Sequence, residues 1–236
     1  MIDSKYWNLS YTLTISFIVL VIFTITQSLV VLFLTSKNSQ VLPNVYETLV
    51  YSNLGLISSI SSTLGLFALL FFIKIKNKEL KDYLNLIIPK TSYFLLFLFT
   101  SFFLMFMMEK LTHYNPVIFE TDFVLKSYKQ AVSLPILYLG VVLLGPLFEE
   151  VLFRGFLFKG LEKSFLGGHG AVFVTSFIFS LIHMTQYGVA VIFVMILPMS
   201  VLLGYARLYS QSLLLPIFLH VMNNLITCLI THFEVY

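Results

Sequence analysis

The sequence predicts an all-α protein, built as a polytopic transmembrane helical bundle with about seven spans. Of its 236 residues, 58% are hydrophobic and only 11% are charged, whereas an average soluble domain has about 25% charged residues. A soluble fold of this size would have too few charged side chains to cover its surface. The composition therefore excludes a soluble domain and indicates an integral, multi-pass membrane protein.

The spacing of the charges gives the second observation. A helix needs about 20 apolar residues to cross the hydrocarbon core of a bilayer. Asp, Glu, Lys and Arg are absent from 6–36, 48–73, 91–108, 130–148, 164–206 and 208–233. The fifth of these runs is 43 residues long, so it must hold two crossings, with a turn near Thr185–Gly188. In chain order, the expected helices lie near 10–34, 48–73, 91–108, 131–158, 170–186, 189–208 and 212–231.

The first three expected helices form a transmembrane scaffold domain over residues 1–130. Their polar content is small apart from Gln27 and a serine-rich face over 58–62, and small residues of this kind let membrane helices pack closely. The charged stretch 74–82 fits a solvated loop at anionic lipid headgroups. The connection 109–130 is polar and is expected to be an external loop.

The distribution of Lys and Arg predicts the orientation. With the N-terminus in the cytoplasm, ten of these residues lie on the cytoplasmic side and four on the other, and such an excess marks cytoplasmic loops. The net charge of +3 therefore bears on orientation, and no nucleic-acid partner is expected. The ten are Lys5, Lys74, Lys76, Lys78, Lys81, Lys90, Arg154, Lys159, Lys163 and Arg207, and the four are Lys37, Lys110, Lys126 and Lys129.

The last four expected helices form a second domain over residues 131–236, which holds the residues that can carry chemistry. Glu149, Glu150 and Arg154 lie within an apolar helix, where each charge costs about 2.5–3.5 kcal/mol. Glu150 precedes Arg154 by four residues, which is the favourable order for an ion pair. Glu149 is rotated by about 100° from Glu150. A charged cluster at the end of a helix would explain Arg154 well and the two glutamates poorly.

Two further pairs of residues lie on later helices. Phe179 and His183 share one helix face, and so do His220 and Asn224, because residues four apart are neighbours on a helix. From the helical rise, Glu149, His220 and His183 lie roughly 15, 12 and 20 Å from the expected cytoplasmic boundary. The three helices can therefore bring these groups together, in a water-filled cavity that we expect to open toward the cytoplasm.

These motifs resemble the signature of the CPBP intramembrane proteases, a family that includes CAAX prenyl endopeptidases and the bacteriocin-related Abi proteins. The matching motifs are Glu-Glu-x-x-x-Arg at 149–154, Phe-x-x-x-His at 179–183 and His-x-x-x-Asn at 220–224. The resemblance implies a CPBP-like catalytic core over 131–236 and hydrolysis of peptide bonds in membrane-embedded or lipid-modified peptide or protein substrates. It also implies a bacterial cytoplasmic membrane as the location, with the lipid bilayer as the surroundings of the whole chain.

The resemblance further implies a role for each matched residue. Glu149 would be the general base that activates water, and His183 would hold that water, or a metal with it. His220 and Asn224 would complete a metal site or stabilise the oxyanion. The residues implied to shape the site are Glu150, Arg154 and Phe179.

Two mechanisms fit this set of residues. Glu149, His183 and His220 would suit a catalytic zinc with an open position. The same residues would suit a Glu–His pair that activates water without a metal. With only two histidines in the set, and with Asn a poor zinc ligand, the metal-free version is favoured. No cofactor is assigned, and zinc is the candidate if one is used.

Other function classes are weaker interpretations of the same residues. A transporter could use acidic and histidine side chains as a proton relay, but it would be expected to show paired halves, and the motifs fall in one half only. A bacteriocin-immunity protein that does not cleave would not need intact motifs. The single cysteine, Cys228, excludes a cysteine-based zinc cage. The intramembrane endopeptidase is the interpretation that accounts for all of these residues.

Overall fold

The computed structural model describes residues 6–36, 43–76, 79–115 and 122–235. Their regular structure is entirely helical. Six helices are long and apolar enough to cross a membrane, and a seventh apolar helix, α11 (Gly167–Ile182), is shorter, with 16 residues. This confirms the predicted all-α bundle of about seven spans.

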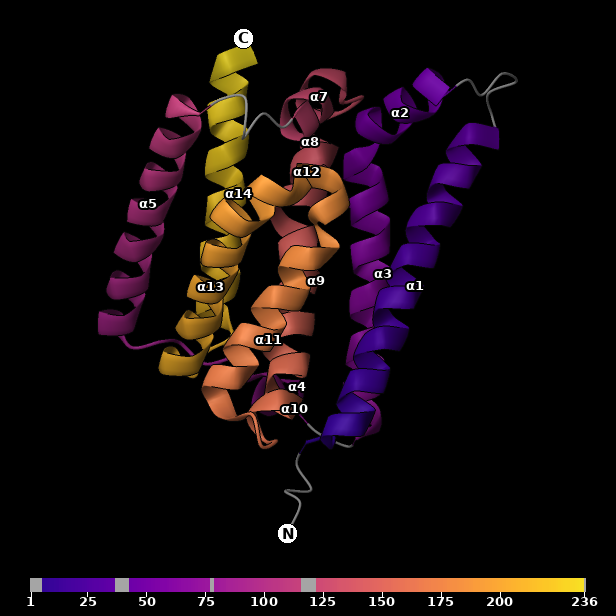
Figure 1. Cartoon of the computed structure of the whole chain (residues 1–236). Helices are drawn as coiled ribbons and strands as arrows, with labels where there is room; N and C mark the ends of the chain where they lie inside the picture. The colour runs from indigo at the N-terminus through magenta and orange to yellow at the C-terminus, as the bar shows by residue number, and fades with distance from the viewer. Residues whose placement is uncertain (1–5, 37–42, 77–78, 116–121, 236) are drawn as a thin grey trace.

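The first half of the chain supplies three of the long helices: α1 (Leu9–Ser36), α3 (Leu54–Ile75) and α5 (Thr91–Tyr114). Short helices connect them: α2 (Pro43–Ser52) and α4 (Leu80–Leu84), with α7 (Asp122–Gln130) leading into the second half. The helix expected from residue 48 is interrupted at Asn53, whose side-chain amide donates back to the Leu49 carbonyl at 3.0 Å. In Figure 1, α1 and α3 lie together at one edge of the bundle and α5 lies at the opposite edge.

The second half begins with one long rod, Leu134–Glu162, that runs through the centre of the bundle. It consists of α8 (Leu134–Tyr138), η1 (Leu139–Leu144), α9 (Gly145–Glu150), η2 (Val151–Leu157) and α10 (Phe158–Glu162). The segments η1 and η2 are wider π-helical turns, which often occur at functional sites. Pro146 has no N–H to give to the carbonyl one turn earlier, so the regular hydrogen-bond ladder is broken next to η1. The two π-helical turns flank the short segment that carries Glu149 and Glu150.

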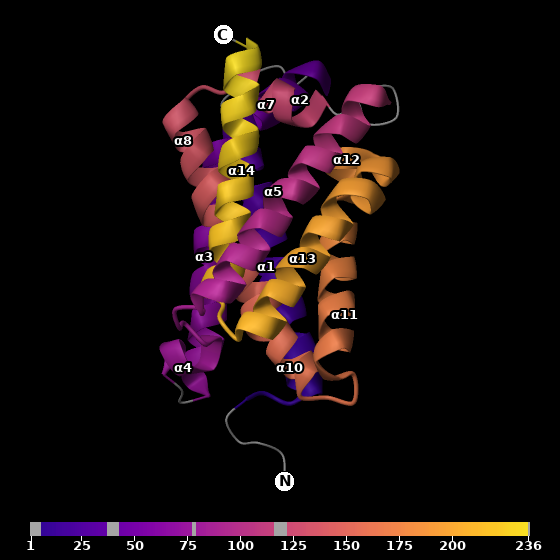
Figure 2. The same ribbon diagram turned by 90° about the vertical axis from the view of Figure 1, so that its left-hand side faces the viewer.

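The remaining helices are α11, α12 (Met184–Val191), η3 (Ile192–Ile196), α13 (Leu197–Ser210) and α14 (Leu214–Val235). The predicted turn in the long apolar run is present, because Gly188 adopts φ 76° and ψ 166°. The α11 helix ends at Ile182, four residues before the expected end at 186, because His183 already leaves the helical ladder. Figures 1 and 2 show α5, α13 and α14 on the side of the bundle opposite α1.

Close backbone packing joins the scaffold to the central rod. A methyl group added to Gly140 would lie only 2.3 Å from the Gly55 carbonyl oxygen, so α3 and η1 touch through their main chains. The Ser58 hydroxyl also donates to the Gly140 carbonyl at 3.1 Å. The serine-rich face of α3 therefore packs as small residues in membranes are expected to.

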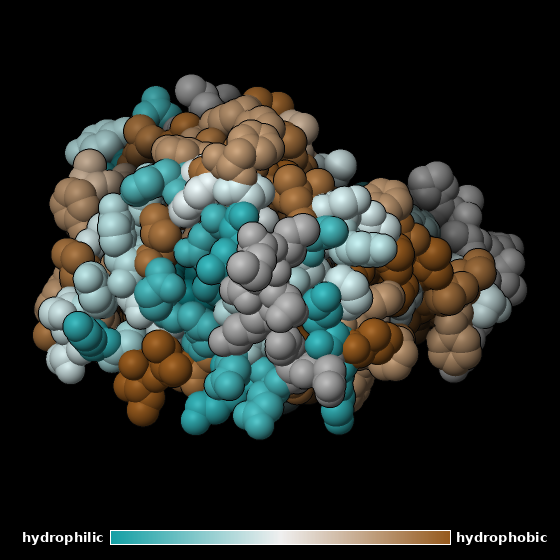
Figure 3. All heavy atoms as spheres, turned by 90° about the horizontal axis from the view of Figure 1, so that it is seen from below, coloured by the Kyte–Doolittle hydropathy of each residue, from teal (hydrophilic) through white to brown (hydrophobic). Residues whose placement is uncertain are grey.

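The bundle has two chemically different ends (Figure 1). The start of α1, the end of α3 and α10 lie at one end, which we call the lower end, and α2, α7 and the last turns of α14 lie at the upper end. Seen from below, polar residues gather over the middle of the lower face (Figure 3). The described Lys and Arg residues gather at these two ends, in the two groups that the sequence predicts. Lys5, Lys37 and Lys78 are not among the described residues. Arg154 is an exception, because it is fully buried within the bundle.

Candidate active site

Three helices bring three of the predicted catalytic side chains together. Glu149 lies at the end of α9, His183 directly follows α11, and His220 lies on the second turn of α14. The His183 Nε2 atom is 3.9 Å from Glu149 Oε1, and the His220 Nε2 atom is 3.7 Å from Glu149 Oε2. One carboxylate is therefore flanked by two imidazole rings, one facing each of its oxygens.

The other nitrogen of each ring is held by an acceptor. His183 Nδ1 lies 2.8 Å from the Phe179 carbonyl oxygen, and His220 Nδ1 lies 2.9 Å from Glu150 Oε1. A carbonyl or an ionised carboxylate can only accept a hydrogen bond, so Nδ1 carries the proton in both rings. In the neutral rings, each Nε2 therefore presents a lone pair toward Glu149, an assignment that follows from the partners.

Glu150 holds both His220 and Arg154 through one carboxylate oxygen. Its Oε1 atom accepts from His220 and from Arg154 Nη1, both at 2.9 Å, and the Glu150 and Arg154 side chains are fully buried. The ion pair that the i,i+4 spacing predicts is therefore present. Arg154 also donates from Nη2 to the Ser200 hydroxyl at 2.6 Å and to the Ser200 carbonyl at 3.0 Å. These bonds tie η2 and α14 to α13.

Phe179 packs at the centre of this arrangement. Its ring lies 4.7 Å from the His183 ring and 5.9 Å from the His220 ring. The Arg154 guanidinium also lies 4.7 Å from the centroid of the Phe179 ring, a distance typical of cation–π contact. The structure thus places Phe179 between both histidines and the buried ion pair, where it restricts the orientation of the rings.

Asn224, the fourth predicted catalytic residue, has a different partner. Its side-chain amide donates to the Val141 carbonyl in η1 at 2.8 Å, so it joins α14 to the widened turn before α9. A side-chain amide has two N–H groups, and one of them makes this bond. The neighbouring Asn223 lies between helices, and its side-chain oxygen accepts from the Ser101 hydroxyl of α5 at 2.9 Å.

The described geometry does not fit a shared zinc ion. Two ligands of a tetrahedral zinc, each about 2.0–2.2 Å from the metal, lie roughly 3.4 Å apart, and the Glu149 to histidine separations of 3.9 and 3.7 Å are wider. Among the described residues, no group of three or more His, Cys, Asp or Glu side chains is arranged to hold a metal. We therefore derive no chemical step through a metal.

The same separations suit a water molecule. They exceed the 2.7–3.2 Å of a direct hydrogen bond, and Glu149, His183 and His220 keep 20%, 17% and 11% of their side-chain surface exposed. A water with two O–H groups can donate to the carboxylate and to one Nε2 at the same time. The arrangement can therefore hold a nucleophilic water and accept its proton.

Sequence reasoning missed the roles of Ser200 and Arg207. Arg207 is fully buried, and its Nε atom donates to the Arg154 carbonyl at 3.1 Å. The α13 helix therefore binds the Arg154 side chain through Ser200 and the Arg154 main chain through Arg207. A signal for Arg207 existed, because it is the only Asp, Glu, Lys or Arg residue between 164 and 233, and such isolated charges tend to be functional. Ser200 has no comparable signal among the many serines of the chain.

Comparison with known proteins identifies part of the chain. Residues 131–226 match the family model described as type II CAAX prenyl endopeptidase Rce1-like. The match includes all three motifs and so confirms the resemblance expected from them. No curated protein matches the chain, and no solved structure matches it.

Proposed function

Since residues 131–226 form an Rce1-like segment, of a family of CAAX-type endopeptidases, we propose that the protein hydrolyses peptide bonds in membrane-associated peptide or protein substrates, with Glu149 activating the water. The observation that supports this most directly is the Glu149 carboxylate flanked by the Nε2 atoms of His183 and His220 at 3.9 and 3.7 Å. The Glu149 carboxylate and the His183 Nε2 atom can both accept from one reacting water, which places the general base within reach of the proton it takes.

In the proposed reaction, the water donates one O–H to Glu149 and the other to His183 Nε2. The water oxygen attacks the carbonyl carbon of the scissile bond as its proton passes to the Glu149 carboxylate. A tetrahedral intermediate with a negatively charged oxygen forms. Glu149 then returns the proton to the leaving nitrogen, and the C–N bond breaks to give a free carboxylate and an amine.

His220 and Asn224 are the proposed donors to the oxyanion. The hydrogen bond from His220 Nδ1 to Glu150 fixes the orientation of the ring, and the ring would donate to the oxyanion from Nε2 in the state in which that atom also carries a proton. Asn224 would use the amide N–H that does not bond to Val141. Removal of one such donor typically costs about 10²–10³ in rate.

The substrate and location belong to the same proposal. A lipid-modified or membrane-embedded segment could reach a site inside the bundle from the bilayer. We place the N-terminus in the cytoplasm on the basis of the Lys and Arg distribution. The bacterial cytoplasmic membrane is proposed from the resemblance to the CPBP family alone. A proton-relay transporter is disfavoured because the ionisable residues of the bundle centre belong to the Rce1-like segment.

The proposal is tested with purified protein in detergent and a lipid-modified peptide that ends in a Cys-aliphatic-aliphatic-X sequence. Mass spectrometry of the products should show one new amine and one new carboxylate at a defined bond. A preparation stripped of metal, verified by elemental analysis, should keep the rate of the untreated protein. Loss of cleavage on stripping, with recovery on adding zinc, would establish the metal-dependent version instead.

A further inference from the structure

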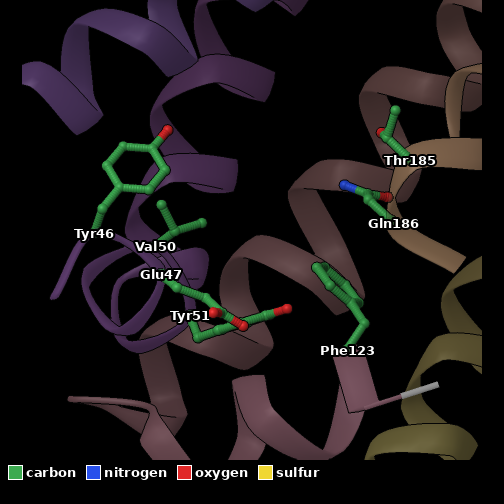
Figure 4. Close-up of a pocket in the computed structure, with 7 residues that line it drawn as sticks. All are labelled: Tyr46, Glu47, Val50, Tyr51, Phe123, Thr185 and Gln186. Carbon is green, nitrogen blue, oxygen red and sulfur yellow. The ribbon is translucent and has the colours of Figure 1, made fainter. Parts of the chain in front are cut away.

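A pocket lies at the upper end of the bundle, between α2, α7 and α12 (Figure 4). Its volume is about 240 Å³, below the roughly 300–1,000 Å³ of small-molecule sites, so it suits a side chain better than a whole cofactor. Figure 4 shows Tyr46 and Val50 on one wall and Thr185 and Gln186 on the other. The lining residues are Tyr46, Glu47, Val50, Tyr51, Phe123, Thr185 and Gln186.

This pocket lies near the candidate active site, because α12 supplies one of its walls and directly follows His183. Gln186 donates its backbone N–H to the His183 carbonyl at 3.1 Å, and the wall formed by Thr185 and Gln186 begins two residues after His183. The Tyr187 ring lies 6.3 Å from the His183 ring and 5.2 Å from the Phe123 ring. Phe123 is therefore no more than about 12 Å from the His183 ring, a distance that three or four residues of extended peptide can cover.

The chemistry of the walls favours an uncharged side chain. Aromatic rings and Val50 supply apolar surface, and the Gln186 amide and Thr185 hydroxyl can bond to a peptide backbone. The one acidic wall residue, Glu47, is paired with Lys126 at 3.4 Å, so its charge is compensated. A positively charged substrate residue would have to compete with this pair for Glu47.

We propose that this pocket is a specificity subsite for the substrate, receiving an uncharged apolar or aromatic side chain three or four residues from the scissile bond. This inference rests on the proposed endopeptidase function. Five of the seven lining residues precede residue 131, the start of the Rce1-like match. Selectivity at this position would thus come from the first half of the chain, and catalysis from the second half.

The test uses lipid-anchored peptides in which each position around the cleaved bond is varied in turn, with products identified by mass spectrometry. Val50→Trp fills the pocket, and Val132→Trp is the matched control, because Val132 lies at the same end of the bundle and is 77% exposed. We expect Val50→Trp to lower kcat/KM at least 10-fold for peptides with Phe or Leu at the subsite position. An apolar pocket discriminates between side chains by about 10–200-fold. Peptides with Gly there should be cleaved at an unchanged rate, because Gly has no side chain to enter the pocket.

The outcomes separate the two proposals. If the unaltered protein cleaves none of these peptides, the proposed function fails and the subsite with it. If it cleaves them and Val50→Trp shows the same profile as Val132→Trp, the subsite alone is overturned. Should Val50→Trp fail to fold, Gln186→Trp fills the pocket from the opposite wall and is judged by the same criterion.

Discussion

Replacement of the buried Glu150–Arg154 pair separates its contribution to folding from its contribution to the site. The three variants are Glu150→Leu, Arg154→Leu and the double variant. Glu150 Oε1 accepts from both Arg154 and His220 at 2.9 Å, and both members of the ion pair are fully buried. A single change therefore leaves one charged group inside the bundle without its main partner.

The size of each effect follows from these contacts. Removal of one partner of a buried ion pair costs about 3–5 kcal/mol, whereas replacement of both by apolar residues is often close to neutral. Here the double variant also leaves His220 Nδ1 without its Glu150 acceptor, and a buried polar group without its partner costs about 1–3 kcal/mol. We expect the double variant to be about 1–3 kcal/mol more stable than the worse single variant, and still less stable than the unaltered protein.

The assay is reversible unfolding in mixed micelles, with peptide cleavage measured on the folded fraction. Stability should partly recover in the double variant, but cleavage should stay low because His220 has lost the carboxylate that holds its Nδ1. If the double variant is as unstable as the worse single variant, the pairing argument is wrong. Full cleavage by the folded double variant would show that Glu150 has no role in positioning His220.

Two further predictions concern the membrane orientation and the neighbouring residues Asn223 and Asn224. Reporter fusions at Lys76 and Asn115 should fall in opposite compartments, with Lys76 cytoplasmic, since α5 separates them; the same compartment for both would refute the span count. Asn224→Ala should cut cleavage by about 100-fold if its amide donates to the oxyanion, whereas Asn223→Ala should lower the unfolding temperature and leave the rate per folded molecule unchanged. Equal rate losses in both would assign Asn224 a packing role.

The sequence was informative wherever helix periodicity alone determines position. The charge-free runs located the spans, and the spacing of Glu150 and Arg154 predicted their pairing, because both depend only on the local helix. The convergence of Glu149, His183 and His220 was also foreseeable, from their depths along three helices.

Contacts that depend on tertiary packing were not foreseeable. The π-helical turn η1 makes the Val141 carbonyl available to Asn224. Apart from Pro146, no local sequence pattern predicts this turn. Arg207 had been counted among the cations of the cytoplasmic side, but the structure buries it against the Arg154 carbonyl. The upper pocket combines residues as distant as Tyr46 and Gln186, so only the folded chain could show it.

The most direct test of the account is the cleavage rate of Glu149→Gln. Gln keeps the size and polarity of Glu149 but cannot take a proton from water, and loss of a general base typically costs about 10²–10⁴ in rate. We predict at least a 100-fold loss of cleavage of the lipid-modified peptide, with an unfolding temperature close to that of the unaltered protein. Cleavage at the unaltered rate by the folded variant would contradict the account.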